Sequence, residues 1–448
     1  MTVHDFPRLL VVTSNNFNLV TGGGIMLTNL FRGWPADRIA NLHEDPTPED
    51  HSVCRNFYRL SQEEIHWVWP FSLAEPWRSV EVPAIGSGPA SGNRMSALSV
   101  DGVEGEAVWL RWMRRVLGDG MPRTARITDR LTRWLETFQP EVLYGFLGSM
   151  AQIRLVRELA KALAIPVVVH IMDNWPIVLY RRGLLGPLLR RVVRSEFEEV
   201  LRNASVRMGI CEDMCGEYSQ RYGYSFLAFH NALDMEEWLP HAKRNWRAGS
   251  PFIVRYVGSI LPDGQRESLR EVCEAIAGLR ASGASLEMWV HAPKEQATYL
   301  HNAGIPFEGI HLEGPPSPDS IARLLAGADL LVLPFNFDAR SAEYIRLSMP
   351  TKIPAYMASG TPILVYGPPR VAAVRYAQGE GWGCVVSTGG VPALQKTLLQ
   401  LMADQAVRER LGRRAQELAR QRHDAAKVRP AFWDALAAAS GTRRLAYR

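Results

Sequence analysis

The fold is decided by residues 252–291, which read FIVRYVGSILPDGQRESLREVCEAIAGLRASGASLEMWVH. An apolar, β-branched run, Phe252–Val257, leads through a glycine-containing loop to an amphipathic segment, Arg266–Ala281. A second apolar run, Leu286–His291, follows after a short link. This order is typical of a βαβ unit, in which two parallel strands are joined by a helix.

The same alternation continues in both directions along the chain. On the N-terminal side, strands are expected at Leu9–Thr13, Val142–Phe146, Ile165–Ile171, Val206–Ile210 and Phe226–Phe229. On the C-terminal side, they are expected at Leu330–Leu333, Pro362–Tyr366 and Cys384–Ser387. The sequence thus predicts an α/β protein with two Rossmann-like, doubly wound domains that face each other across a cleft. A ligand is expected in that cleft, outside the carboxyl ends of the two sheets.

Changes in composition indicate the domain limits. We expect an N-terminal domain over residues 1–240, interrupted by a tryptophan-rich insertion over residues 45–125. A polar, basic run, Leu239–Ser250, indicates a linker, and the second domain is expected over residues 251–422. Residues 423–448 are expected to form a C-terminal helix, with packing back on the N-terminal domain as one option. The arginines between Arg408 and Arg422 are predicted to lie on solvated helix faces.

Composition excludes several classes of protein. The chain has 448 residues, 47% hydrophobic and 22% charged, which is typical of a globular protein rather than a disordered or fibrous one. It has no run of eighteen or more apolar residues and no signal-peptide pattern, so we expect a cytoplasmic protein. Five cysteines form an odd, sparse set, for which packed thiols are the simplest interpretation. The net charge of +5 suits nucleotides, anionic carriers or a lipid surface, and no nucleic-acid recognition motif is present.

Two features of the first domain are candidates for ligand contact. Gly22, Gly23 and Gly24 follow the first strand and precede a predicted helix, Ile25–Trp34, so their backbone N–H groups are expected to point at the cleft. A plain tight turn explains these glycines equally well. His170 and Asp173 end another strand of the same domain, where ligand-contacting groups are expected. The alternatives are a core histidine and a helix-capping aspartate.

The second domain offers a candidate anion site at the start of a helix predicted over Ser348–Ser359. Ser348 and Thr351 are expected to bond the first helical amides, and Lys352 supplies a positive charge there. An unpaired cation at a helix N-terminus opposes the helix dipole, so Lys352 suggests an anionic ligand such as a diphosphate. A surface lysine paired with Asp338 or Glu343 is the alternative.

In order and spacing, these motifs resemble those of the GT-B glycosyltransferases, specifically the GT4-like retaining family that builds bacterial surface polysaccharides. The resemblance covers nearly the whole chain except residues 45–125. In the first domain it rests on the glycine loop, the strand end His170–Pro176, the stretch Ile210–Met214 and the crossover His230–Asp234. In the second it rests on Val257–Ile260, Ala328–Pro334 and Pro350–Pro362.

The resemblance implies transfer of a sugar from a nucleotide sugar to a glycan, lipid-linked or other acceptor, with the nucleotide held mainly by the second domain. It implies no metal or other cofactor, because basic side chains and helix N-termini take the charge of the departing diphosphate. Carried over to this sequence, His170, Asp173 and Lys352 are the catalytic candidates. The donor-binding candidates are Gly22, Gly23, Gly24, Gly258, Ser259, Arg266, Glu343, Ser348, Thr351 and Lys352.

The sequence departs from the family at the positions of its paired glutamates, which are Leu347 and Ala355 here. The family's arginine after the glycine of the first strand of the second domain is Ser259. Glu343 is a candidate substitute for one missing carboxylate. The departures favour one alternative to a transferase, an inactive sugar-nucleotide-binding subunit. A second alternative, a nucleotide-sugar epimerase on the same fold, would require acid/base carboxylates at the cleft, and the missing glutamates argue against it.

Two basic segments raise the question of a membrane partner. Trp109–Arg115 interleaves tryptophan with arginine, and the predicted helix Leu184–Asn203 carries Arg190, Arg191 and Arg194 just after Arg181. This pattern is compatible with peripheral docking at the inner face of an anionic membrane, where lipid-linked acceptors reside. Solvated helix faces explain the same residues.

Overall fold

The computed structural model describes residues 6–61, 63–68, 115–117, 123–181, 183–302, 304 and 308–441. The chain divides into two compact units. Unit 1 comprises Met1–Phe229 together with Arg429–Arg448, and unit 2 comprises His230–Val428. No helix in the described part of the chain is long and apolar enough to cross a membrane.

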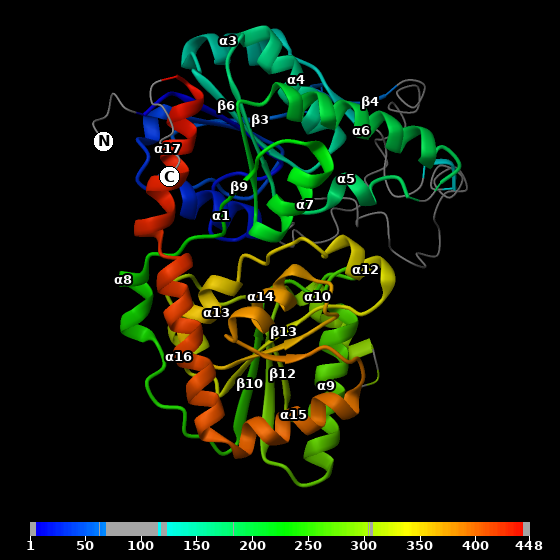
Figure 1. The fold of residues 1–448 in the computed structure, drawn as a ribbon, viewed down its shortest axis with the longest axis vertical. Helices are drawn as coiled ribbons and strands as arrows, with labels where there is room; N and C mark the ends of the chain where they lie inside the picture. Colours follow the sequence, from blue (N-terminus) through cyan, green and yellow to red (C-terminus); the bar gives the residue numbers. More distant parts are fainter. Residues whose placement is uncertain are drawn as a thin grey trace. The chain divides into compact units, whose positions relative to one another are not determined.

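Unit 1 is built on a seven-stranded parallel sheet with the order β3-β2-β1-β6-β7-β8-β9. Strands β3, β6 and β9 of this sheet are labelled in Figure 1. The central strands are buried along their whole length, as expected for a parallel sheet covered on both faces. An antiparallel pair, β4 and β5, lies outside this sheet. The strands of unit 1 are β1 Leu9–Val12, β2 Ile39–His43, β3 Asn56–Arg59, β4 Ile65–Trp67, β5 Arg123–Ala125, β6 Val142–Leu147, β7 Val167–Ile171, β8 Val206–Gly209 and β9 Leu227–Ala228.

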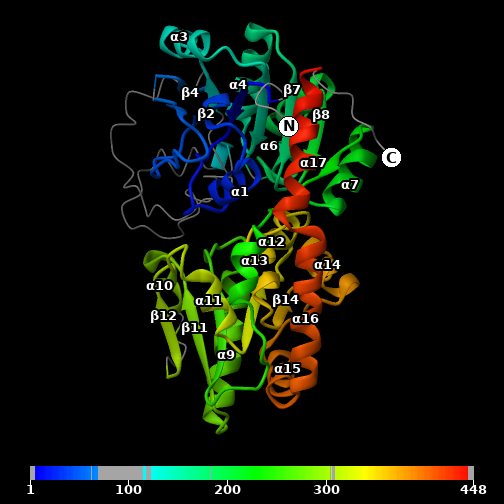
Figure 2. The same ribbon diagram turned by 90° about the vertical axis from the view of Figure 1, so that its left-hand side faces the viewer.

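The helices of unit 1 connect successive strands and cover the sheet (Figure 2). They are α1 Gly22–Phe31, the 3-10 turn Ala36–Arg38, α3 Asp129–Phe138, α4 Met150–Leu163, α5 Trp175–Val178, α6 Gly186–Asn203 and α7 Glu212–Tyr222. Helix α17, Ala425–Ala439, begins in unit 2 and continues along unit 1. There Trp433 donates from Nε1 to the carbonyl of Leu30, and Phe432 packs edge-on against Phe31 and Tyr144. The C-terminal helix therefore completes the core of unit 1.

Unit 2 has a six-stranded parallel sheet with the order β12-β11-β10-β13-β14-β15. Its strands are β10 Phe252–Val257, β11 Leu286–His291, β12 Ile310–Glu313, β13 Leu330–Pro334, β14 Ile363–Tyr366 and β15 Cys384–Val386. Its helices are α8 Met235–Trp238, the 3-10 turn Leu239–His241, α9 Arg266–Ala281, α10 Lys294–Asn302, α11 Ile321–Ala326, α12 Ala339–Tyr344, α13 Ile353–Ser359, α14 Ala372–Glu380, α15 Val391–Ala403 and α16 Gln405–Arg422.

Both sheets have the strand order of a Rossmann fold. The first strand lies at the centre, the next strands are added on one side of it, and the later strands are added on the other side. The change of side falls between β1 and β6 in unit 1 and between β10 and β13 in unit 2. Loops leave the two strands in opposite directions at such a switch point, which opens a crevice at the carboxyl ends of the strands. A ligand site is therefore expected at the loop after β1 in unit 1 and at the loop after β10 in unit 2.

The segment predicted to be an interdomain linker is packed into unit 2. Trp246 is buried and donates from Nε1 to the carbonyl of Gly360, at 2.8 Å. The guanidinium of Arg408 donates to the carbonyl of Trp246, at 2.9 and 3.0 Å, and is itself buried. The prediction that Arg408 is solvated is therefore wrong. The linker sequence is mostly polar, but it contains one buried aromatic residue, Trp246, and Arg408 is buried as the hydrogen-bond partner of its carbonyl.

Candidate functional site

The loop after β10 meets the start of α13 at the switch point of unit 2. Tyr356 of α13 ties the two elements together, because its hydroxyl accepts from Val257 N at 2.8 Å and donates to Val257 O at 3.1 Å. Lys352 stands one helical turn before Tyr356. Side chains four residues apart lie on one face of a helix, so Lys352 is held over the end of β10.

The ammonium of Lys352 lies directly over Gly258. A Cβ added to Gly258 would lie 2.8 Å from Lys352 Cε and closer still to Nζ. Gly258 also has φ of +136°, a conformation that residues with a side chain rarely adopt. The glycine at this position is therefore required twice, once by the backbone and once by the lysine that covers it.

The tyrosine at the end of β10 supports this lysine. Lys352 Nζ donates to the hydroxyl of Tyr256 at 3.0 Å and lies 4.2 Å from the centre of its ring. Gln265 also donates to that hydroxyl, at 3.2 Å, and the hydroxyl in turn donates to the carbonyl of Ser259. Tyr256 is fully buried, and burial raises its pKa, so the phenol stays neutral. Neither Tyr256 nor Gln265 stands out in the sequence.

Lys352 has no carboxylate partner among the described residues. Burial lowers the pKa of its ammonium to about 7, since the charged form loses water and gains no counter-charge. The expected alternative, an ion pair with Asp338 or Glu343, is wrong. Asp338 accepts from the amides of Arg340 and Ser341, and Glu343 lies 3.8 Å from the guanidinium of Arg346. A desolvated ammonium without a counter-charge either releases its proton or pairs with an anionic ligand.

Ser259 follows Gly258 at the position of the family's arginine. Its amide has no hydrogen-bond partner among the described residues, so it is a further donor beside Lys352. Two of the predicted donor-binding residues, Gly258 and Ser259, are thus adjacent to Lys352 in the structure. In the family's pattern an arginine in the loop after this strand supplies a positive charge. Here the positive charge at the end of β10 belongs to Lys352, which extends from the start of α13.

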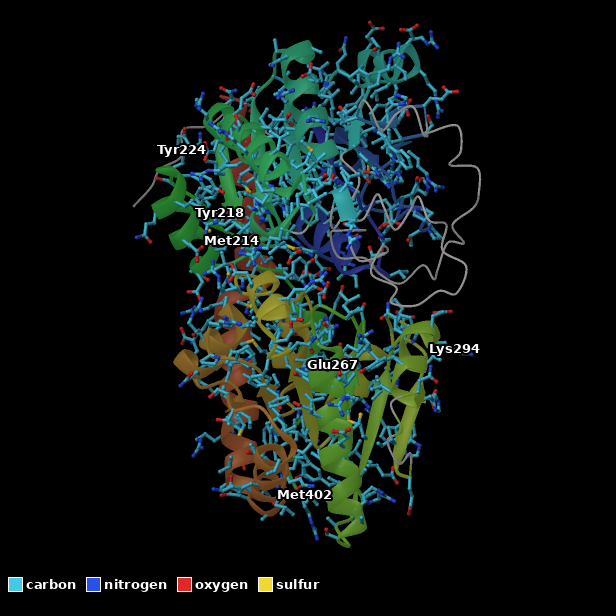
Figure 3. All side chains as sticks on the ribbon, turned by 90° about the vertical axis from the view of Figure 1, so that its right-hand side faces the viewer. Met214, Tyr218, Tyr224, Glu267, Lys294 and Met402 are labelled. Atoms are coloured by element: carbon cyan, nitrogen blue, oxygen red, sulfur yellow. The ribbon has the colours of Figure 1, made fainter. Side chains whose placement is uncertain are left out.

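Arg266 is engaged elsewhere. Its guanidinium lies 3.3 Å from Glu267, labelled in Figure 3, and 4.2 Å from the ring centre of Tyr299. The first amides of α9, those of Glu267 and Ser268, donate to the side chain of Asn336 at 3.0 and 3.2 Å. The start of α9 is therefore occupied by protein groups, and the structure does not bring Arg266 to Lys352.

The helix predicted from Ser348 begins at Ile353. Lys352 is its N-cap residue, and the side chain of Lys352 makes no capping bond. Pro354 near the start of the helix fits this late beginning, because proline lacks an N–H and suits the first helical turn. Ser348 is buried, and the carbonyl of Thr351 accepts from Asn231 at 2.8 Å.

In unit 1, α1 begins at Gly22 rather than at Ile25, so the glycines form its first turn. A Cβ at Gly23 would lie 2.7 Å from Asn15 Cγ, and a Cβ at Gly24 would clash with the amide of Asn18. Asn18 Oδ1 in turn accepts from the amides of Val20 and Thr21, at 2.9 and 2.7 Å. Close packing of the asparagine loop accounts for these glycines, and their contact with a ligand stays a prediction.

His170 lies in the core of unit 1. It is fully buried, its Nδ1 is 2.7 Å from the hydroxyl of Tyr144, and its ring packs against Phe229 and Phe432. Burial lowers its pKa to about 3, so the imidazole is neutral at all ordinary pH values. These are the properties of a core histidine, the alternative left open by the sequence.

Asp173 is half-buried, just after β7. Asp173 directly precedes Asn174, the N-cap residue of α5. Its role in catalysis stays a prediction.

Metal-ligating side chains, cysteines and a surface groove are three further features that could form a site. Within the described residues, no three His, Cys, Asp or Glu side chains gather to hold a metal ion. Cys54, Cys211, Cys215 and Cys273 form no disulfide and are buried, and burial raises the pKa of each thiol to about 12. A groove of about 720 Å³ borders α16 and is lined by Glu236, Leu239, Pro240, Ala242, Lys243, Arg244, Trp246, Arg413, Gln416 and Arg420. Trp246 places this groove at the C-terminal end of α13, whereas Lys352 precedes the other end.

Family models match both halves of the chain. A glycosyl transferase 4-like domain matches residues 73–226, and a domain of the glycosyl transferases group 1 matches residues 251–404. No curated protein matches the sequence.

Solved structures share the fold at low sequence identity. Anabaena HepE, crystallised with UDP-glucose, is 13% identical with a TM-score of 0.60, over 96% of this chain and 100% of that one. Sucrose-phosphate synthase from Thermosynechococcus elongatus is 12% identical with a TM-score of 0.61, over 95% and 96%. WaaG, described as a glycosyltransferase involved in lipopolysaccharide biosynthesis, is 12% identical with a TM-score of 0.55, over 96% and 99%.

Two Rossmann-like units with parallel sheets, on one chain that superposes along its length on such structures, define a GT-B fold. With the two matched domains, the chain belongs to the GT-B glycosyltransferases, with a 4-like N-terminal domain and a group 1 C-terminal domain. The predicted fold and the predicted enzyme class are confirmed.

Proposed function

We propose that this glycosyltransferase moves a sugar from a nucleotide sugar to a glycan or lipid-linked acceptor, and that Lys352 holds the donor diphosphate. The observation that carries the proposal is the ammonium of Lys352, which lies over Gly258 at the switch point of unit 2 without a carboxylate partner among the described residues. Anabaena HepE was crystallised with UDP-glucose and with UDP, which supports a nucleotide-sugar donor for a chain of this fold.

The chemistry asks little of the protein beyond this charge. As the bond between the sugar and the diphosphate breaks, negative charge grows on the diphosphate, and a cation already in place stabilises it without reorganisation. The acceptor oxygen forms the new bond to the sugar carbon, and its proton passes to an oxygen of the departing diphosphate. We propose that no metal ion is needed, because Lys352 and the Ser259 amide take the leaving-group charge. Retention at the sugar carbon is proposed from the likeness to the GT4-like family.

Calorimetry with a panel of nucleoside diphosphates tests the donor site. One of them should bind with a stoichiometry of one, and the matching nucleotide sugar should release nucleoside diphosphate in the presence of acceptor. Turnover should persist in excess EDTA. If no nucleoside diphosphate binds, the transferase proposal fails, and if EDTA stops turnover, the metal-independent mechanism fails. Epimerised donor without transfer would support the epimerase alternative.

Donor affinity should fall as the pH rises above about 7. The free ammonium of Lys352 has a pKa of about 7, and a bound diphosphate favours its charged form, so the pKa rises on binding. Affinity is therefore complete below the free pKa and declines above it, by up to about ten-fold per pH unit. Calorimetric titrations between pH 7 and pH 9 should show this decline and proton uptake on binding. A Lys352→Met variant should show no such pH dependence, and an equal slope in both proteins would remove Lys352 from the site.

A further inference from the structure

Exposed apolar side chains gather at one tip of unit 1. Among the described residues, the large hydrophobic side chains that are exposed are Leu19, Val20, Leu184, Leu185, Leu188 and Leu399. Three of these fall within five consecutive positions at the start of α6, and Leu184 and Leu188 expose 77% and 60% of their surface. Scattered exposed leucines need no explanation, but a cluster indicates an interaction surface.

Arginines surround these leucines. Arg181 precedes them, Arg115 lies beside them, and Arg191 and Arg194 follow on α6, all of them exposed. The amide of Leu184 donates to the carbonyl of Arg115 at 3.1 Å, which brings these two segments together. Arg191 has no ion-pair partner among the described residues, whereas Arg194 pairs with Glu198 at 2.8 Å. The cluster is therefore apolar at its tip and positively charged around it.

The backbone beneath the cluster is well held. The amide of Leu185 donates to Val116 O at 2.9 Å, and Arg190 donates to the carbonyls of Tyr180 and Arg181 at 3.4 and 3.3 Å. Backbone hydrogen bonds thus hold Leu184 and Leu185 to residues 115–116.

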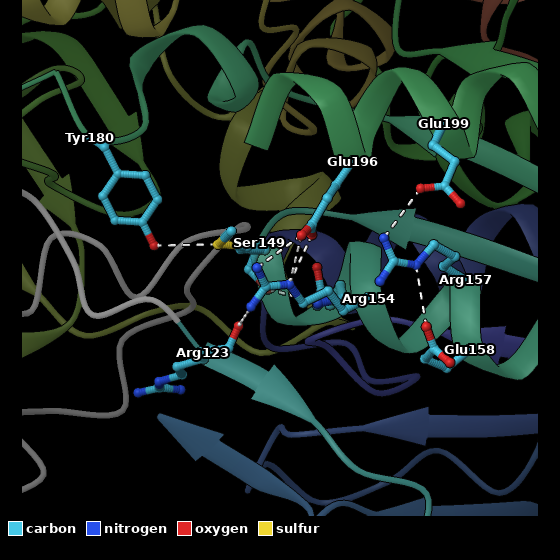
Figure 4. Close-up of polar contacts among 10 residues, drawn as sticks. Arg123, Ser149, Arg154, Arg157, Glu158, Tyr180, Glu196 and Glu199 are labelled. Carbon is cyan, nitrogen blue, oxygen red and sulfur yellow. Dashed lines mark hydrogen bonds and ion pairs between the residues drawn. The ribbon is translucent and has the colours of Figure 1, made fainter. Parts of the chain in front are cut away.

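Ion pairs farther along α6 fix this helix to α4 (Figure 4). Arg154 forms a two-pronged contact with Glu196 at 2.8 and 2.9 Å, and Arg157 contacts Glu199 at 3.3 Å. Arg154 also donates to the carbonyl of Arg123 on β5. Val193 and Phe197 are buried on the face of α6 opposite Leu188, so Leu188 is presented outward.

We propose that the surface formed by Leu184, Leu185, Leu188, Arg181 and Arg191, the leucine–arginine surface, docks on a membrane that contains anionic phospholipids. Each leucine can insert individually into the boundary between the lipid headgroups and the acyl chains, and the neighbouring arginines can contact lipid phosphates. A stable protein–protein contact buries about 1,600 Å² in total, and a tip of three leucines falls well short of that. The inference rests on the proposed function in one respect: docking would bring the enzyme to a lipid-linked acceptor.

Cosedimentation of the full chain with vesicles tests this docking. Vesicles of phosphatidylcholine with phosphatidylglycerol should bind the protein, and vesicles of phosphatidylcholine alone should bind it much less. Leu184→Ser with Leu188→Ser should lower binding to the anionic vesicles by about ten-fold or more. Arg191→Gln should lower it mainly at low salt, because exposed charges are screened. Leu399→Ser and Arg410→Gln, exposed residues on unit 2, are the matched controls and should bind like the wild type.

Loss of binding must be separated from loss of function. The double leucine variant should bind nucleoside diphosphate in solution as the wild type does, because its substitutions lie on the other unit from Lys352. Docking is overturned if the wild type ignores anionic vesicles, or if the double variant binds them as well as Leu399→Ser does. It is also overturned if the leucine substitutions instead dissolve a dimer seen in sedimentation equilibrium, which would assign the surface to a second copy. Failure to bind nucleoside diphosphate overturns the donor site and leaves the vesicle result standing.

Discussion

Replacing Lys352 by methionine should abolish sugar transfer and, at the same time, make the free protein harder to unfold. The ammonium of Lys352 is the charge that we propose stabilises the departing diphosphate, and removal of one such group costs about 10²- to 10³-fold in turnover. In the free protein, burial holds the pKa of Lys352 near 7, below its ordinary value of 10.5. The folded state therefore binds this proton less well than the unfolded chain, and the free energy of unfolding rises with pH between about 7 and 10.5.

Methionine fills similar space and removes the free-energy cost of desolvating the ammonium, so the melting temperature at pH 7 should rise by about 3 °C or more. Product formation and thermal unfolding measure the two effects. Lys396→Met, which removes an exposed lysine of α15, should change neither. A Lys352→Met enzyme with near-normal turnover would show that the lysine does not act on the donor. A lower melting temperature would show that the ammonium is stabilised by the fold itself.

The second large effect is expected from Gly258→Ala. The new Cβ would collide with the end of Lys352, and alanine is strained at φ of +136°. We expect the ammonium to be displaced from the end of β10, with a loss of nucleoside diphosphate affinity of about 100-fold. Calorimetry on the purified variant measures this loss.

Gly283→Ala separates strain from collision. Gly283 also has positive φ, +91°, but a Cβ there would meet nothing within 4 Å. This control should lose stability like Gly258→Ala while retaining donor affinity. Equal losses of affinity in both variants would mean that the lysine above Gly258 is irrelevant to the donor.

The fold was largely predictable because its strands are short, apolar and β-branched. Phe252–Val257 and Leu286–His291 were predicted with the bounds that the structure shows. Strands β2 and β3 were missed, because Ile39–His43 contains Asn41 and His43, and Asn56–Arg59 is largely polar. Strand β3 lies inside the predicted insertion and yet extends the main sheet. These two segments are strands because they pair with neighbouring strands of the sheet, although their own composition does not indicate a strand.

The candidate site was predictable in part. Lys352 and Gly258 stand out in the sequence, and the structure brings them together. Tyr256, which receives the lysine, is one more aromatic residue in an alternating strand, and only the distance of 3.0 Å identifies its role. Of the residues from 69 to 114, including most of the segment Trp109–Arg115, nothing is described.

The surroundings of other predicted site residues could not be predicted, because sequence position does not reveal contacts between distant segments. His170 ends a strand where ligand contacts are expected, but an aromatic shell from β6, from the residue after β9 and from the C-terminal helix encloses it. Arg266 begins a helix beside the candidate site, yet Glu267 and Tyr299 hold its guanidinium. In each case a contact between distant segments decided the outcome.

A crystal structure of the full chain with its nucleoside diphosphate tests the central claim most directly. A phosphate oxygen should lie about 3 Å from Lys352 Nζ, above Gly258 and next to the Ser259 amide. A diphosphate bound elsewhere, for example to Arg244 and Arg420 in the groove beside α16, would contradict the assignment of Lys352.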